Sequence, residues 1–176
     1  MKKKCLLLLF FLVCTVLSHG GEKNEPELFR WELDLGGTCY YVSEANYWNF
    51  GPELTTHYAI TETKGIYLTL SYPFKRLTSR GYGFREGFAG DLGGWFSPRG
   101  LQSRLKLGVG LSHIFGSDSD GSLIGDTGLH ISGQASYRVT RKLGVWVRGI
   151  LRYWLSDRRY EVKFSPSFSA GIGYRF

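Results

Sequence analysis

The sequence predicts an all-β protein in which about eight antiparallel strands run up and down around a closed barrel. Three observations support this fold class. Apolar and polar residues alternate with the period of two that is typical of strands. Glycine makes up 24 of the 176 residues, which disfavours helices because each interior glycine costs a helix about 1 kcal/mol relative to alanine. After the first 20 residues, no apolar run approaches the length of a membrane-spanning helix.

Residues 1–20 have the composition of a secretory signal and should not contribute to the fold. Residues 2–4 are lysines, and residues 5–17 are apolar or uncharged. This run is shorter than the roughly 20 residues of a transmembrane helix, and small residues then predict cleavage after Gly20. The predicted organisation is therefore a signal peptide followed by one barrel domain over residues 21–176.

Charge and cysteine content exclude several classes of protein. The formal net charge of +7 falls to +4 when the three lysines of the signal are removed. This mild excess requires no nucleic-acid partner, and a basic patch would instead meet anionic lipid headgroups. Cys39 is the one cysteine after the signal, so no internal disulfide is expected. No cluster of Cys and His has metal-ligand spacing, and we expect no cofactor.

Eight segments carry the alternation, each about as long as a tilted strand needs to cross a bilayer. They lie near residues 30–41, 54–61, 66–72, 84–96, 105–112, 129–139, 145–155 and 163–176. In the first three, the apolar face contains Trp31, Leu33, Leu35, Leu54, Tyr58, Ile60, Ile66, Leu68 and Leu70. The opposite face contains Glu32, Asp34, Thr38, Thr55, His57, Thr69 and Ser71.

The fourth segment is the least regular, because Glu86 shares a face with Phe84, Phe88 and Leu92. Such an acid is tolerable only near a membrane rim, where a charge costs little. The last four segments return to a clear alternation. Their apolar face contains Leu105, Leu107, Val109, Leu111, Leu129, Ile131, Val145, Val147, Leu151, Phe164, Phe168, Ile172, Tyr174 and Phe176. Their opposite face contains Lys106, Gly108, His130, Ser132, Arg148, Arg152, Gly171 and Arg175.

The connections between segments also alternate. Tight turns are predicted at 61–65, 97–100 and 140–144, and longer polar loops at 43–52, 75–83 and 116–126. The final loop, at 156–160, is short. Short turns on one side and long loops on the other are typical of transmembrane barrels, whose long loops lie outside the cell. Both termini would then lie on the side of the short turns.

The composition of the two faces favours a membrane barrel over a soluble β-sandwich. A solvent-facing surface would be rich in Lys and Glu, whereas here the polar face is mostly Gly, Ser and Thr with a few ionisable residues. That composition suits a narrow enclosed lumen. The apolar face carries many aromatic residues near the strand ends, as an aromatic girdle at each interface would. Strands can cross lipid only as a closed barrel, because every backbone group needs an internal partner.

The chain ends in Gly-Tyr-Arg-Phe, with Phe168, Ile172, Tyr174 and Phe176 on the apolar face. This segment resembles the terminal strand of bacterial outer-membrane proteins, which ends in Phe with an aromatic residue two positions earlier. The resemblance implies a small eight-stranded barrel in the bacterial cell outer membrane, and a terminal strand that the barrel assembly machinery reads. Outer-membrane lipids and lipopolysaccharide would surround it. We expect a monomer with a structural or surface-interaction role through its extracellular loops.

An eight-stranded barrel is just wide enough for side chains to fill it. The ionisable residues predicted for the lumen are Arg30, Glu32, Asp34, His57, Lys106, His130, Arg138, Arg148, Arg152 and Lys163. We predict a plug of salt bridges, with Glu32 and Asp34 against Arg148 and Arg152, because an unpaired buried charge costs several kcal/mol. The alternative is a narrow pore for small solutes or ions, which would favour anions because this set holds more cations than anions.

A lipid A-modifying enzyme is the third class considered. Some outer-membrane barrels deacylate lipid A, and His130-Ile131-Ser132 resembles the His-x-Ser pair of that family. A serine nucleophile needs a histidine base within hydrogen-bond reach and an acid that orients it. The chain departs from the family pattern, since Gly133 follows the serine where the family has Asn, and no acid lies about a dozen residues later. We therefore predict no enzymatic activity and keep His130 and Ser132 as the catalytic alternative.

Overall fold

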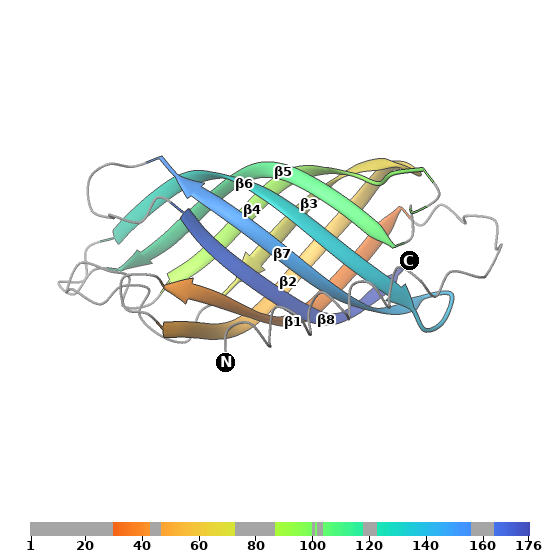
Figure 1. The fold of residues 1–176 in the computed structure, drawn as a ribbon, viewed down its shortest axis with the longest axis horizontal. Helices are drawn as coiled ribbons and strands as arrows, with labels where there is room; N and C mark the ends of the chain where they lie inside the picture. The colour runs from red at the N-terminus through yellow and green to blue at the C-terminus, as the bar shows by residue number, and fades with distance from the viewer. Residues whose placement is uncertain are drawn as a thin grey trace.

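The eight predicted strands are present and form one closed antiparallel barrel (Figure 1). The computed structural model describes residues 30–42, 47–72, 87–99, 101, 104–117, 123–155 and 164–176. Within these ranges there is no helix that is long and apolar enough to cross a membrane. The strands are β1 (Trp31–Val42), β2 (Tyr47–Thr61), β3 (Lys64–Ser71), β4 (Gly87–Phe96), β5 (Leu105–Ser117), β6 (Leu123–Arg138), β7 (Leu143–Trp154) and β8 (Phe164–Arg175).

Each strand pairs with the next one along the chain, and β8 closes the barrel by pairing with β1. In the closing pair, Glu32 lies opposite Arg175 and Tyr40 lies opposite Ser167. The backbone hydrogen-bonding groups of all eight strands are therefore directed to neighbouring strands. A closed barrel has no edge, so it is a structure that strands can adopt in hydrocarbon.

The period of two separates an apolar outer surface from a polar interior. Residues alternate strictly between exposed and buried along β3, where Leu68 is 41% exposed and Tyr67 is 3% exposed. The outward side chains of the other strands are likewise apolar, for example Val109 and Ile131. The buried set is dominated by Asp, Glu, His, Arg, Ser and Thr. This distribution is the reverse of the one in a soluble domain.

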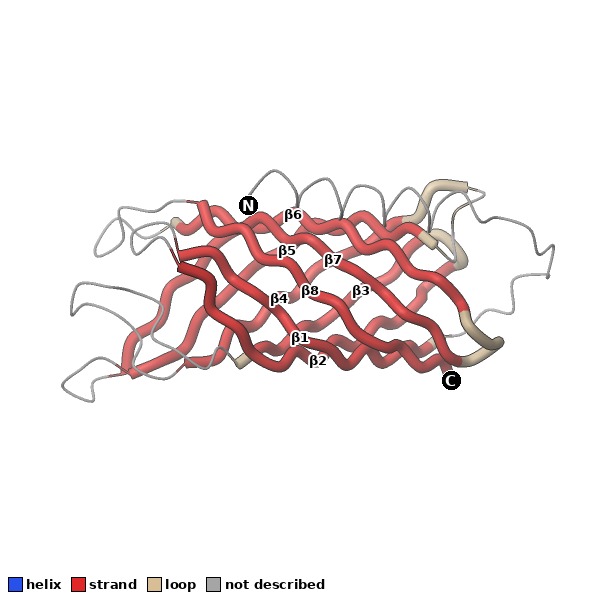
Figure 2. The backbone as a smooth tube through the Cα atoms, turned by 60° about the horizontal axis from the view of Figure 1, so that its bottom comes forward, coloured by secondary structure: helices blue, strands red, loops and turns tan. Residues whose placement is uncertain are grey.

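Both ends of the strand series lie at one end of the barrel, as the sequence predicts, but the connection predicted as a tight turn at 97–100 is longer, because β5 begins only at Leu105. The described residues of the β2–β3, β4–β5 and β6–β7 connections lie at the same end as the start of β1 and the end of β8 (Figure 2). We call this the terminal end, and the opposite end the far end. The connections of the far end, and with them Glu86, lie outside the described residues.

Two predicted loops of the far end are shorter in the structure. The loop predicted over 43–52 is wrong in extent, because β2 already begins at Tyr47 and pairs with β1 up to Val42. The loop predicted over 116–126 also shrinks, because β6 begins at Leu123. Asn49 and Asp126 have the polar side chains typical of loops, but both lie on long strands and are buried in the barrel.

Inward-facing glycines make room for large inward-facing rings. A Cβ added at Gly93 or Gly108 would lie 2.9 Å from the ring of Tyr67. A Cβ at Gly65 would lie 2.6 Å from the indole of Trp95. The glycines that argued against helices in the sequence thus have a packing role, because they leave space for the inward-facing rings of Tyr67 and Trp95.

Candidate functional site

The candidate site is the polar interior of the barrel, and its side chains form three successive clusters of charges. The cluster nearest the terminal end is centred on Glu32. The carboxylate accepts a hydrogen bond of 2.8 Å from Nζ of Lys106 and one of 2.5 Å from Nε of Arg175. The Lys106 ammonium also lies 5.5 Å from the ring centroid of Trp95. Both oxygens of Glu32 therefore have a cationic partner.

Asp34 lies beside this group and is fully buried. Its Oδ2 accepts a hydrogen bond of 2.7 Å from Nε2 of Gln134 and lies 3.1 Å from Nε2 of His57. Ligand atoms of Glu32, Asp34 and His57 all lie within 4.8 Å of one another, which is close enough for a shared cation. A metal ion would have to displace the two basic side chains already bound to Glu32, so these residues do not fit a resident metal.

The central cluster is built around Arg148, which is 4% exposed. Its NH2 group donates to Glu53 and, over 2.5 Å, to Oγ1 of Thr55. Its NH1 group donates to Oγ1 of Thr69 over 3.3 Å. The other oxygen of Glu53 accepts a bond of 2.9 Å from Ser169. The Arg148 guanidinium of β7 thus binds side chains of β2 and β3, and Glu53 links this cluster to Ser169 of β8.

The third cluster joins Arg152 of β7 to Asp91 of β4 across the barrel. The guanidinium donates two hydrogen bonds to the carboxylate, of 2.9 Å from Nε and 2.5 Å from NH2. This two-pronged geometry is the strongest arrangement of such a pair. NH1 donates to Ser167 over 2.7 Å, and the guanidinium carbon lies 5.3 Å from the ring centroid of Tyr40.

His130 belongs to a chain of hydrogen bonds that ends on Asp91. Ser112 donates to Oδ1 of Asp91 over 2.5 Å and lies 2.9 Å from Nδ1 of His130. Nε2 of His130 contacts the hydroxyl of Tyr67, which lies 3.1 Å from Oγ of Ser132. A neutral imidazole that donates from Nδ1 and accepts at Nε2 satisfies every member of this chain.

The His130 and Ser132 pair does not form a nucleophile and its base. The tyrosine hydroxyl lies between the two side chains, so the serine has no direct hydrogen bond to the imidazole. His130 is 3% exposed and faces the lumen, whereas an acyl-chain substrate would arrive from the lipid side. The acid that the sequence lacked downstream is present in space as Asp91, but it reaches the imidazole through Ser112.

The structure places Glu32, Asp34, Arg148 and Arg152 inside the barrel, but the predicted pairing among them is wrong. Arg148 pairs with Glu53, and Arg152 pairs with Asp91. Neither acid was in the predicted lumen set. Alternation alone could have found both, since Glu53 precedes the outward Leu54 and Asp91 precedes the outward Leu92.

The described lumen does not have the predicted excess of cations. Its acids are Glu32, Asp34, Glu53, Asp91 and Asp126, and its bases are Lys106, Arg138, Arg148, Arg152 and Arg175. The prediction that Arg30 faces the lumen is wrong, because this residue precedes β1 and is exposed. Lys163 lies outside the described residues. The balance of charge removes the reason to expect an anion-selective pore.

The same fold occurs in solved structures of bacterial outer-membrane proteins. The N-terminal barrel domain of OprF from Pseudomonas aeruginosa has 17% identity and a TM-score of 0.57, over 83% of this chain and 96% of that one. Ail, the attachment invasion locus protein of Yersinia pestis, solved with the heparin analogue sucrose octasulfate, has 15% identity and a TM-score of 0.55, over 83% and 97%. A major outer membrane protein of Thermus thermophilus has 12% identity and a TM-score of 0.58, over 83% and 99%.

The chain has the fold of the small bacterial outer-membrane β-barrels. No protein-family model matches the sequence, and no curated protein does. The similarity of this chain to these proteins is therefore one of fold, the closed β-barrel, and not of sequence. This confirms the fold class that the alternation and the terminal strand predicted.

We expect a low ion conductance that rises when the central cluster is opened. In planar bilayers, Arg148→Ala should produce conductance steps that are absent from the wild-type protein. The substitution removes the guanidinium that binds Glu53, Thr55 and Thr69. It also frees the Glu53 carboxylate, so the new current should favour cations. The exposed turn variant Arg141→Ala should remain as silent as wild type. A folded Arg148→Ala protein without current would contradict the assignment of this cluster as the plug.

Proposed function

We propose that the protein is an integral barrel of the bacterial outer membrane, with a side-chain-filled lumen and a structural or surface-interaction role at its far end. The observation that carries this proposal is the reversal of polarity across the barrel wall. Large apolar side chains cover the outside, while charged pairs fill the inside. Only a lipid environment stabilises such an exterior, since a soluble protein rarely exposes contiguous apolar patches of more than a few hundred Å².

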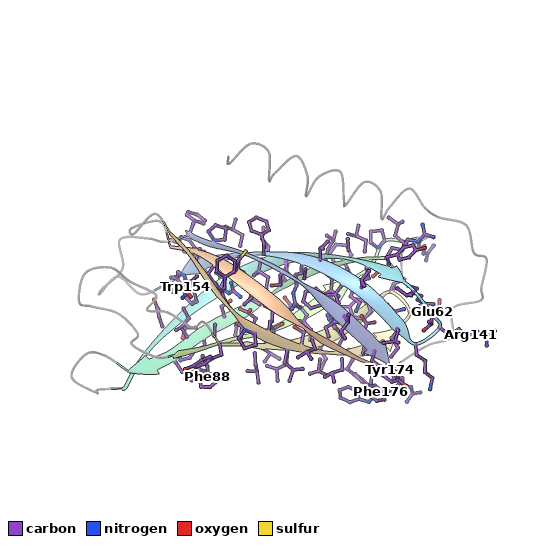
Figure 3. All side chains as sticks on the ribbon, turned by 90° about the horizontal axis from the view of Figure 1, so that it is seen from below. Glu62, Phe88, Arg141, Trp154, Tyr174 and Phe176 are labelled. Carbon is purple, nitrogen blue, oxygen red and sulfur yellow. The ribbon has the colours of Figure 1, made fainter. Side chains whose placement is uncertain are left out.

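The two ends of the chain support a route to that membrane. Residues 1–20 would direct export and be removed, leaving residues 21–176 as the barrel domain. Phe168, Ile172 and Tyr174 of β8, and Phe176 directly after it, have outward-facing side chains (Figure 3 labels the last two). They would form the signal that the barrel assembly machinery recognises. The completed barrel would be a monomer in contact with outer-membrane lipids and lipopolysaccharide.

The surface-interaction part of the proposal places the terminal end toward the periplasm and the far end outside the cell. Short turns on the periplasmic side are the usual arrangement in outer-membrane barrels. Ail shares the fold and binds a sulfated heparin analogue. By analogy, the far end of this barrel is the place where an external partner would bind.

The two other functions receive less support from the lumen. A pore needs a continuous path, and here Arg148 donates hydrogen bonds to three side chains, while Arg152 donates to two, Asp91 and Ser167. A lipid A deacylase needs its catalytic serine next to a base and open to lipid. His130 and Ser132 have neither property, so we propose no enzymatic role for them.

The proposal predicts a heat-dependent gel mobility in an isolated outer-membrane fraction. A closed barrel stays folded in cold detergent and unfolds on boiling, so boiled and unboiled samples should migrate as different bands. Mass spectrometry of the same band should find an N-terminus close to Gly21. A soluble periplasmic protein without a mobility shift would overturn the membrane assignment.

A further inference from the structure

Basic side chains surround the barrel at its terminal end. We call them the basic rim, and they are Arg30, Lys64, Arg99, Arg104, Arg141 and Lys142. All are exposed except Arg104, which is half-buried. Among the described residues of this end, Glu62 is the one exposed acidic side chain. The rim therefore carries a strong positive charge, although the lumen that it encircles is balanced.

The basic rim is a ring and not a single patch. Its members come from the entry into β1, the start of β3, the β4–β5 connection and the β6–β7 turn. These segments follow one another around the circumference, because each strand pairs with the next. Figure 3 shows the β2–β3 and β6–β7 turns, marked by Glu62 and Arg141, at the same end as Phe176. A ring of charge matches a plane of headgroups better than it matches one compact ligand.

Hydrogen bonds hold the backbone that carries these charges. In the β6–β7 turn, Oγ1 of Thr140 accepts bonds of 3.3 Å from the amide of Lys142 and 2.9 Å from that of Leu143. The carbonyl of Lys142 accepts a bond of 2.9 Å from the amide of Arg175 on β8. The charged side chains can move, but the turn that carries them is fixed to the barrel wall.

An aromatic girdle lies at the same level as the basic rim. Exposed aromatic side chains at the terminal end are Trp31, Phe96, Tyr137, Tyr174 and Phe176. The ammonium of Lys142 lies 5.9 Å from the ring centroid of Tyr174, so a member of the basic rim contacts a member of the aromatic girdle. Aromatic rings of membrane proteins gather at the headgroup level, so the rim charges lie where lipid phosphates are.

We propose that the basic rim binds the phosphates of anionic phospholipids in the leaflet at the terminal end. This inference rests on the proposed membrane function and gives that function a lipid specificity. In the proposed orientation the leaflet is the periplasmic one. Basic residues next to a membrane surface attract anionic lipids over about one Debye length. A ring that reaches all sides of the barrel would collect a shell of such lipids.

The test uses protein purified from membranes and reconstituted in vesicles of equimolar phosphatidylcholine and phosphatidylglycerol. Electron paramagnetic resonance of spin-labelled lipids gives the relative association of each lipid with the barrel. We expect phosphatidylglycerol to be favoured about threefold at low salt and to lose this preference at high salt. Arg141→Gln/Lys142→Gln should reduce the preference, whereas Arg141→Lys/Lys142→Arg, which keeps both charges, should retain it. Glu62→Gln should change it in the opposite direction.

Equal association of the two lipids, or a preference that survives removal of the charges, would overturn the inference. Binding of the detergent-solubilised protein to purified peptidoglycan that depends on Arg141 and Lys142, without a lipid preference, would assign the rim to the cell wall instead. Gel mobility of the same vesicles separates the two proposals. A heat shift without a lipid preference rejects only the basic rim, and a missing shift rejects the membrane barrel itself.

Discussion

Replacing Arg152 with Met should lower the free energy of unfolding by about 3–5 kcal/mol. Arg152 is 1% exposed and Asp91 is fully buried, and the two are joined by two hydrogen bonds. Methionine has a similar length but no charge, so the substitution leaves a carboxylate without its cation in a site that water hardly reaches. Urea-induced unfolding in vesicles of phosphatidylcholine alone, which contain no anionic lipid for the basic rim, measures the effect by tryptophan fluorescence.

The double variant Asp91→Asn/Arg152→Met separates charge from packing. It removes both charges, so it should recover at least half of the stability that Arg152→Met loses, since a missing pair is less costly than a broken one. Arg141→Met on the exposed β6–β7 turn is the matched control and should stay within about 0.5 kcal/mol of wild type. If Arg152→Met is as stable as this control, the pair does not support the barrel.

Replacing Gly36 with Ala should lower the free energy of unfolding by about 1–3 kcal/mol through overpacking. This residue faces the lumen in β1, and a Cβ there would lie 2.3 Å from the carbonyl oxygen of Ala170 and 2.7 Å from the indole of Trp146. The oxygen belongs to the backbone of β8 at the seam that closes the barrel. Relief therefore requires a shift of the strand, and the same unfolding measurement should detect it.

The neighbouring Gly37 provides the matched control, because it lies on the same strand and faces outward. A Cβ at Gly37 would find its nearest neighbour at 3.9 Å, the carbonyl oxygen of Gly51. Gly37→Ala should therefore be neutral or stabilising by up to about 1 kcal/mol, because alanine restricts the unfolded chain. Equal stability of the two variants would mean that β1 and β8 can shift apart at little cost in free energy.

The two stability predictions bear directly on the proposed function. The ion pair of Arg152 and the ring-over-glycine packing at Gly36 both depend on a lumen that is filled from wall to wall. A barrel with a water-filled pore would tolerate Arg152→Met and Gly36→Ala, because water could solvate the unpaired carboxylate and a wider lumen could accommodate the added methyl group. A barrel built as a scaffold for its far end should lose stability with each of them.

The sequence by itself determined the fold class and the assignment of faces. A period of two, glycine in place of helix formers, and a terminal strand ending in Phe176 were sufficient, because a strand has only two faces and only one arrangement of them suits lipid. The same parity could have placed Glu53 and Asp91 on the inner face. Both were missed, because Glu53 lies just before the predicted segment 54–61 and Asp91 lies in the least regular segment.

Only the tertiary structure decided which charges meet. Glu53 and Arg148 are 95 positions apart, and Asp91 and Arg152 are 61 positions apart, so no local pattern joins them. Their contact depends on the stagger between strands and on the depth of each side chain in the closed barrel. Alternation says which face a residue occupies, but not its height along the axis or its partner across the lumen. For that reason the sequence predicted a plug of salt bridges correctly in kind and assigned its pairs wrongly.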